Sequence, residues 1–167
     1  MTITYRYSTE EDYNIIRELI ELRFGNRDNR GVYDKLDGRY LLAFDNNLLV
    51  GMTGLIDEGN YTGPEIDWTC LRKEYEGNGI ITTLISKVID GIDKDIYCSC
   101  WRYGQNNNVN LQYSMTTLGF RPAIIGHKRF SVKYNKCKNI CVKSCDGCYC
   151  FEDLYVKEHG GNENEQN

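Results

Sequence analysis

The chain has 167 residues, enough for one domain that buries its own core without stabilising disulfides. Hydrophobic residues make up 41% and charged residues 26%, as in an ordinary globular protein, and the formal net charge of -4 argues against a general nucleic-acid binder. The sequence holds no apolar run of the ~20 residues that span a bilayer, and no basic segment followed by an apolar block opens it. We therefore expect a cytoplasmic protein with no membrane attachment.

The first third of the sequence predicts strands around one clear helix. Ser8 and Thr9, followed by Glu11 and Asp12, form a capping-box pattern that opens a helix. Apolar residues then recur three and four positions apart, as on the buried side of a helix, at Tyr13, Ile16, Leu19, Ile20 and Phe24. Strands are expected at Thr2–Tyr7, Arg39–Phe44 and Leu48–Ile56, a short helix at Val32–Leu36, and a hairpin turn at 45–47.

The rest of the sequence alternates strands and helices. Strands are expected at Glu65–Arg72, Ile96–Trp101, Pro122–Val132 and Phe151–Val156, and helices at Ile80–Ile92 and Asn108–Leu118. This order predicts an α/β domain of the α+β kind with a mixed sheet, over residues 1–158. Residues 134–150 form a Cys-rich insertion between the last two strands, and residues 159–167 are polar enough to predict a disordered tail.

A glycine-containing loop joins the predicted strand Glu65–Arg72 to the Ile-rich helix. A helix N-terminus presents unpaired N–H groups and the positive end of the helix dipole, and both favour an anion. Gly77 and Gly79 let the backbone approach such an anion closely. The pattern suits a diphosphate, and a plain strand-to-helix turn would look the same from this motif alone.

The same segment resembles the coenzyme-A-binding motif of the GNAT superfamily, which reads Arg or Gln, two residues, Gly, one residue, Gly or Ala. It falls on Glu76-Gly77-Asn78-Gly79-Ile80-Ile81, where Gly79 matches. Glu76 and Ile81 depart from the residues usual at their positions. The resemblance implies a GNAT-like acyl-CoA N-acyltransferase fold and a site for acetyl-CoA. Its expected binding residues are Cys70, Leu71, Arg72, Gly77, Asn78, Gly79, Ile80, Ile81 and Asn108.

A second segment is similar to the family's Asn-x-x-Ala-x-x-x-Tyr-x-x-x-Gly-Phe helix. Asn108, Leu118, Gly119 and Phe120 fall in register with it. Leu111 replaces the usual Ala, and Met115 replaces the Tyr that often protonates the departing thiolate. Tyr113 and Ser114 are the nearest candidates for that acid, although Tyr113 lies about 160–200° around the helix from position 115.

The family's chemistry needs a base, because an ammonium has no lone pair with which to attack a thioester. Glu65 and Asp67 are two residues apart, so they point to one face of the predicted strand. Glu65 is the first candidate for the base and Asp67 the second. Two carboxylates that only face solvent or form ion pairs, with no catalytic role, would give the same sequence pattern. The expected acceptor is a small or peptidic primary amine, and the resemblance also allows a homodimer.

Eight cysteines in a protein of the reducing cytoplasm favour metal binding or free thiols over disulfides. Five lie within fourteen residues, spaced so that four could surround a structural Zn²⁺. An iron–sulfur cluster, unligated thiols and a disulfide are the alternatives. The candidate ligands are Cys137, Cys141, Cys145, Cys148 and Cys150. Cys98 and Cys100 share one strand face and read as thiols of a core or cleft.

Two other functions remain open at this level. A non-catalytic coenzyme-A-binding or regulatory module would explain the departures at Glu76, Ile81 and Met115. A nucleic-acid or nucleoside modifier on the same fold would use the local positive charge of the Cys-rich segment, at Lys133, Lys136, Lys138 and Lys143. The predicted function is that of an N-acyltransferase, in which an amine attacks the thioester of acetyl-CoA directly.

Overall fold

The computed structural model describes residues 2–24, 40–57, 61–102, 111–127 and 151–160. The elements follow one another as β1 Ile3–Tyr7, a 3-10 turn Glu10–Asp12, α1 Tyr13–Phe24, β2 Tyr40–Asp45, β3 Leu48–Ile56, β4 Glu65–Leu71, a 3-10 turn Lys73–Tyr75, α2 Ile80–Val88, β5 Ile96–Arg102, α3 Gln112–Thr117, β6 Arg121–His127 and β7 Phe151–Lys157. Among these elements, no helix is long and apolar enough to cross a membrane.

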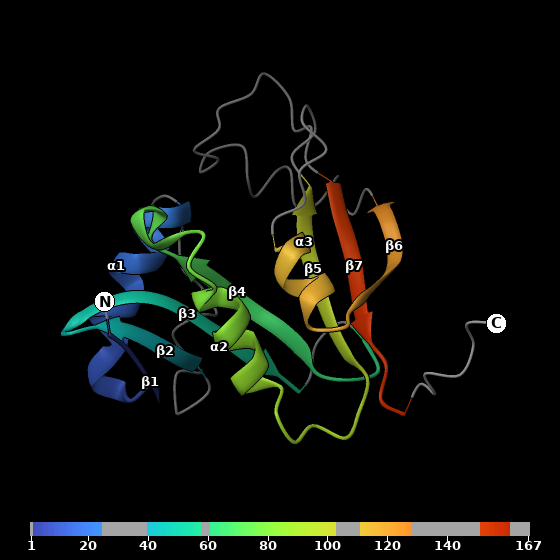
Figure 1. Ribbon diagram of the computed structural model, residues 1–167, viewed down its shortest axis with the longest axis horizontal. Helices are drawn as coiled ribbons and strands as arrows, with labels where there is room; N and C mark the ends of the chain where they lie inside the picture. Colours follow the sequence, from blue (N-terminus) through green and yellow to red (C-terminus); the bar gives the residue numbers. More distant parts are fainter. Residues whose placement is uncertain (1, 25–39, 58–60, 103–110, 128–150, 161–167) are drawn as a thin grey trace.

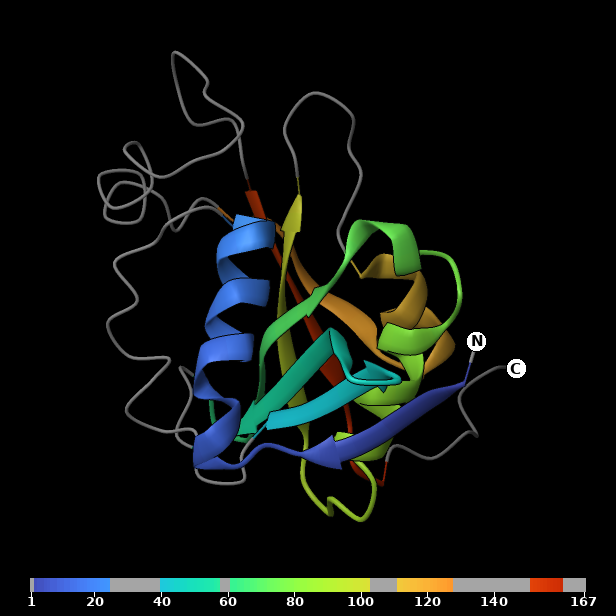
Figure 2. The same ribbon diagram turned by 90° about the vertical axis from the view of Figure 1, so that its left-hand side faces the viewer.

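The seven strands form one mixed sheet in the order β1-β2-β3-β4-β5-β7-β6 (Figure 1). All neighbouring strands are antiparallel except β4 and β5, which run parallel. The connection between this parallel pair carries α2, as a crossover between parallel strands requires. Figure 2 shows α1 on one side of the sheet and α2 and α3 on the other. The result is the mixed α/β architecture that the order of elements predicts.

Apolar side chains on both faces of the sheet form the core. On one face, Ile16, Leu19 and Ile20 of α1 are fully buried against Tyr40 and Met52. We call this group, which also includes Cys70, the α1 cluster. The opposite face packs against α2 and α3 in two further clusters, whose fully buried members include Leu84, Ile85 and Met115. Apolar residues spaced three and four positions apart in α1 and α2 are therefore the buried ones, as this periodicity predicts.

Most predicted elements are confirmed within a residue or two at each end. The helix expected at Ile80–Ile92 ends earlier, at Val88, because Gly91 takes a φ of 75°, the left-handed conformation that ends helices. The hairpin turn at 45–47 is confirmed by Asn46, whose φ is 54°. The helix expected at Val32–Leu36 lies outside the described residues.

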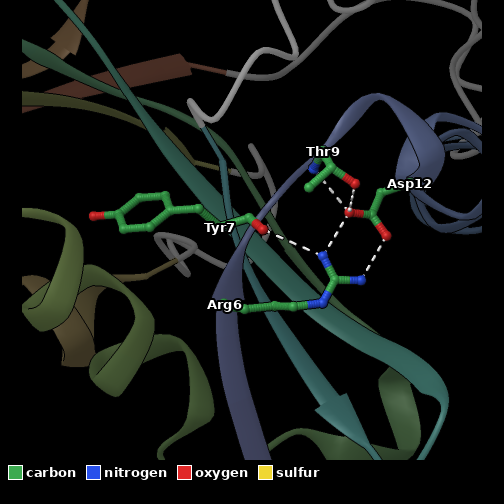
Figure 3. Close-up of polar contacts among 4 residues, drawn as sticks. All are labelled: Arg6, Tyr7, Thr9 and Asp12. Atoms are coloured by element: carbon green, nitrogen blue, oxygen red, sulfur yellow. Dashed lines mark hydrogen bonds and ion pairs between the residues drawn. The ribbon is translucent and has the colours of Figure 1, made fainter.

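The capping pattern between β1 and α1 is also confirmed (Figure 3). Asp12 accepts hydrogen bonds from the Thr9 N–H (2.9 Å) and hydroxyl (3.1 Å), and it forms a two-pronged ion pair with Arg6 at 2.6 and 2.7 Å. These bonds, led by the one from Arg6, lower the pKa of the Asp12 carboxyl to about 2. The buried carboxylate fixes the direction in which the chain leaves the edge strand.

Candidate active site

The parallel strands β4 and β5 pair over a very short length. Their register joins Glu65 to Tyr97 and Ile66 to Cys98, at the start of both strands. Beyond this point the two strands separate, and Figure 1 shows them spreading apart toward their carboxyl ends. Among the described residues, the register of β4 with β3 extends to Leu71, whereas its register with β5 ends at Ile66. An unpaired strand edge inside a sheet offers backbone groups to a ligand.

A bulge in β4 lies at the point of separation. The register against β3 shifts by one residue between the Met52–Cys70 pair and the Gly54–Asp67 pair. Trp68 lies in the inserted stretch with a φ of 42°, a conformation that a bulky residue rarely adopts. Packing of its partly buried side chain against the α1 cluster helps to hold this strained backbone. The bulge bends β4 where it leaves β5.

The end of β4 orients its backbone amides alternately. Arg72 donates its N–H to the Val50 carbonyl on β3 at 2.7 Å. Because amides alternate along a strand, the Leu71 N–H points to the opposite, unpaired edge. The side chain of Cys70 is buried in the α1 cluster, and burial raises the pKa of its thiol to about 12. Of the three residues expected to bind at this edge, Leu71 presents its amide there.

The glycine loop leads into α2 as its spacing predicts. Gly77 and Gly79 have φ of 81° and 71°, so both positions need glycine for their backbone conformation. Thr83 donates its N–H to the Gly79 carbonyl at 3.0 Å, which is the first i to i−4 hydrogen bond of α2. The amides of the preceding turn belong to the group that a helix N-terminus leaves unsatisfied. They follow two glycines at the start of a helix, an arrangement that accepts an anion.

Glu76 lies next to this loop and is neutralised by a distant residue. Arg23, at the end of α1, donates to the Glu76 carboxylate at 2.7 Å. The two residues are 53 positions apart, and both are partly exposed. Ile81, the other departure from the family motif, is partly buried and packs toward the core clusters. Neither departure therefore places an unneutralised charge or a bulky group directly on the helix N-terminus.

The two candidate bases lie on β4 beside the separation. Glu65 is 8% exposed, and it pairs across the sheet with Tyr97. Asp67 is less buried, and one of its oxygens accepts a hydrogen bond from the Tyr40 hydroxyl at 3.1 Å. Both side chains belong to the face of the sheet that α1 covers, because Tyr40 is part of the α1 cluster. The expected common face of these two carboxylates is present.

The candidate acids lie on α3. Met115 is fully buried in the core, and Tyr113 is 80% exposed, so the two side chains point in different directions. Ser114 is buried and its hydroxyl lies 2.9 Å from that of Thr82 on α2. The 160–200° separation of Tyr113 from position 115 thus puts its hydroxyl in solvent. Gly119, with a φ of 80°, ends α3 as expected.

Several predicted site residues lie outside the described part of the chain. They are Asn108, the candidate zinc ligands Cys137, Cys141, Cys145, Cys148 and Cys150, and the lysines of the Cys-rich segment. Within the described residues, no group of three or more His, Cys, Asp or Glu side chains is arranged to hold a metal. Cys98 and Cys100 are buried with their sulfur atoms 3.6 Å apart. The zinc site, the Cys-rich insertion and the homodimer stay predictions.

Two residues that shape this site cannot be recognised from local sequence patterns. Arg23 meets Glu76 only because α1 packs across β3 and β4, and one basic residue at a helix end carries no signal of such a contact. Tyr61 stacks on Tyr97 from the loop before β4, with ring centres 4.9 Å apart. Nothing in the residues around Tyr61 indicates this stacking.

Comparison with known proteins identifies similar domains. The sequence model described as the acetyltransferase (GNAT) family matches residues 6–120. Among solved structures, a GNAT-family acetyltransferase of Bacillus cereus has 13% identity and a TM-score of 0.70, with 95% of this chain and 98% of that chain covered. Arabidopsis thaliana NAA60 in complex with a bisubstrate analogue has 17% identity and a TM-score of 0.69, with coverages of 96% and 100%.

A third similar structure is N-acetylglutamate synthase of Neisseria gonorrhoeae, complexed with coenzyme A and L-arginine. It has 15% identity and a TM-score of 0.62, and the match covers 95% of this chain and 33% of that chain. No curated protein matches the chain in sequence. At these identities the solved structures establish the shared fold, while the family model covers both the glycine loop and α3.

Proposed function

Because the chain belongs to the acetyltransferase (GNAT) family, we propose that it transfers an acetyl group from acetyl-CoA to a primary amine by direct attack. One observation carries this proposal: β4 leaves β5 just before a helix that begins with a glycine loop. A single ligand can then meet an unpaired strand edge and an anion-binding helix end together. Coenzyme A has this combination, with an amide-bearing arm and a diphosphate.

The diphosphate is assigned to the loop Gly77–Ile81. The amides of the first turn of α2 would donate to its oxygens, and the positive φ of Gly77 and Gly79 holds these amides in place. Asn78 contributes to the same loop, since its side-chain amide donates to the carbonyls of Tyr75 and Glu76 at 3.2 and 3.3 Å. Arg23 supports the assignment because it removes the repulsion that Glu76 would exert on an anion.

The amide-bearing arm is assigned to the unpaired edge of β4. The Leu71 N–H points to this edge and would donate to a carbonyl of the arm, as a neighbouring strand would accept it. The bulge at Trp68 turns the backbone between Glu65 and Leu71. An N–H of this turn is the natural donor to an oxyanion that forms on the thioester carbonyl.

Glu65 is the proposed general base, with Asp67 as the second candidate. A carboxylate within reach, directly or through one water, takes a proton from the acceptor's ammonium and frees its lone pair. The nitrogen attacks the thioester carbon, and the C–S bond breaks as the amide forms. The nitrogen gives up its second proton, and the departing sulfur takes one up as it becomes the free thiol. Glu65 suits the base because it lies where β4 and β5 begin to separate.

Two measurements test this proposal on the whole chain. Calorimetry should detect acetyl-CoA binding, and a thiol reagent should detect free CoA released when a panel of primary amines is added. Release that depends on both acetyl-CoA and an amine supports the proposal. Folded protein that shows no affinity for any CoA species contradicts it.

A non-catalytic CoA-binding module is the second candidate, favoured by one observation. Met115 occupies the position of the family's usual acid and is fully buried, while Tyr113 points into solvent. A thiolate leaves acceptably without a dedicated acid, so this observation alone does not exclude transfer. Tight acetyl-CoA binding with no release of CoA across a broad amine panel would favour the module.

A further inference from the structure

The segment before β4 is fastened to the start of β5. Tyr97 donates its N–H to the Pro64 carbonyl at 2.9 Å, and its hydroxyl lies 3.1 Å from that of Thr62. A Cβ on Gly63 would fall 2.2 Å from the Asp95 carbonyl oxygen, so only glycine allows so close an approach. Residues 61–64 are thus held against the strand by backbone and side chains together.

This attachment fixes a pair of aromatic rings. The rings of Tyr61 and Tyr97 stack with centroids 4.9 Å apart and an angle of 16° between their planes. The Tyr61 hydroxyl lies 3.1 Å from that of Ser99, two residues further along β5. Tyr61 therefore lies over the part of β5 that follows its short pairing with β4. Both tyrosines remain partly exposed, so part of each ring is open to a ligand.

The aromatic pair lies on the same face of the sheet as the proposed base. Cys98 and Cys100 point into the core on the α2 side, so the alternating Tyr97 and Ser99 point to the other face. Tyr97 is the register partner of Glu65 in the parallel pair, which places both side chains next to each other on that face. The ring of Tyr97 therefore lies beside the carboxylate of the proposed base.

A second carboxylate lies beyond Glu65 on the same strand face. Two strand residues span about 6.6–6.8 Å, so Asp67 lies roughly that distance from Glu65 along β4. Tyr40 donates to one oxygen of Asp67 and holds this side chain in place. Aromatic faces attract cations, and two carboxylates favour two positive charges. The face thus combines a fixed aromatic pair with two anionic groups at a defined spacing.

We propose that the acceptor is an aliphatic diamine or polyamine whose second ammonium stays charged during the reaction. This inference rests on the proposed function, because it takes Glu65 as the base that deprotonates the attacking nitrogen. The second ammonium lies near Asp67 and against the Tyr61–Tyr97 pair. The carbon chain of the acceptor runs along the same two rings. An amine nitrogen of ordinary basicity is an ammonium at neutral pH, so the second charge persists without help from the protein.

The test compares acceptors that differ in charge. Acetylation of 1,4-diaminobutane, spermidine, n-butylamine and 4-amino-1-butanol is followed by release of free CoA. We expect kcat/KM to be at least about tenfold higher for the two polycations, since losing a partner of a charged group costs about that much. Equal kcat/KM for 1,4-diaminobutane and n-butylamine overturns the inference and leaves the proposed function standing. No acetylation of any amine, with no acetyl-CoA binding, overturns both.

Single-residue variants test which side chains cause the preference for the diamine over the monoamine. Asp67→Asn keeps an oxygen for the Tyr40 hydroxyl and removes the charge, so it should lower the ratio of kcat/KM for 1,4-diaminobutane to kcat/KM for n-butylamine. Tyr61→Leu should lower the preference for the diamine about 3- to 10-fold through the lost ring face. Tyr97→Phe keeps the ring and should retain the preference. Tyr7→Leu, at an exposed position on the edge strand β1, is the control.

Folding and selectivity can be separated in these variants. Each variant is first checked by thermal unfolding and by acetyl-CoA binding, which lies at a different part of the site. If Asp67→Asn and Tyr61→Leu bind acetyl-CoA normally and keep the wild-type ratio of diamine to monoamine turnover, the inference is wrong. A loss of the ratio in Tyr7→Leu as well would equally contradict it, since that residue lies on β1 at the sheet edge.

Discussion

Replacing Arg23 by alanine is expected to weaken acetyl-CoA binding about fivefold. The guanidinium of Arg23 neutralises Glu76 at 2.7 Å, and Glu76 immediately precedes the glycine loop assigned to the diphosphate. The variant leaves this carboxylate unpaired beside two negative charges. Glu76 is about half exposed, so the medium around it is close to water.

The magnitude follows from Coulomb's law. At a separation of ~8 Å in water, each pair of unit charges interacts by about 0.5 kcal/mol, and two phosphate charges give about 1 kcal/mol. That free energy corresponds to about a fivefold change in Kd. The ion pair itself adds little to folding, because exposed pairs contribute about 0–1 kcal/mol. The effect should therefore appear in binding and hardly at all in stability.

Calorimetry of acetyl-CoA binding at low and high salt tests this reasoning. The double variant Arg23→Ala with Glu76→Gln should recover wild-type affinity, because the repelling charge is then absent. In ~1 M salt, where the Debye length is about 3 Å, the difference should disappear. Arg17→Ala removes the same charge from the same helix at its pair with Glu21 and serves as the control. A double variant as weak as Arg23→Ala would refute the electrostatic explanation.

Three further outcomes are expected. Glu65→Gln should lower kcat about 10²- to 10⁴-fold with unchanged Kd for acetyl-CoA in calorimetry, and a loss under threefold would show that Glu65 is not the base. Tyr113→Phe should keep kcat within about twofold in the CoA-release assay, because its side chain is 80% exposed; a tenfold loss would assign it a direct role. Asp12→Ala should lower the free energy of unfolding in urea by about 1–2 kcal/mol at pH 7, because it removes the pairing with Arg6 and Thr9. The Asp12 pKa is depressed from 3.8 to about 2, so this contribution is present above pH ~4 and lost as the pH falls through ~2; a wild-type to variant difference that stays constant over that range would contradict the assignment.

Local patterns predicted most of the fold because they act over a few residues. The capping pattern of Thr9 and Asp12, the strand-to-helix loop at Gly79 and the end of α3 before Gly119 each follow from one or two residues and their neighbours. The period of the apolar residues predicted the buried sides of α1 and α2 for the same reason. The common face of Glu65 and Asp67 followed from strand alternation and survived the bulge, which begins after Asp67.

Long-range contacts explain what the sequence could not predict. Nothing about Trp68 indicates a left-handed backbone; that conformation is held by packing against α1, far away in the sequence. The Arg23–Glu76 pair joins residues 53 positions apart, so nothing in the local sequence indicates that the acidic residue is neutralised. The stacking of Tyr61 on Tyr97 likewise depends on how the loop before β4 meets β5.

Amide hydrogen exchange with and without acetyl-CoA reports on the proposed coenzyme site residue by residue. Slower exchange is expected on binding at Leu71 and at the amides of Gly79, Ile80 and Ile81, with no change at Val50, which lies on a strand that is paired on both sides. Protection elsewhere, with unchanged exchange at the edge of β4 and the start of α2, would contradict the assignment of the coenzyme to this site.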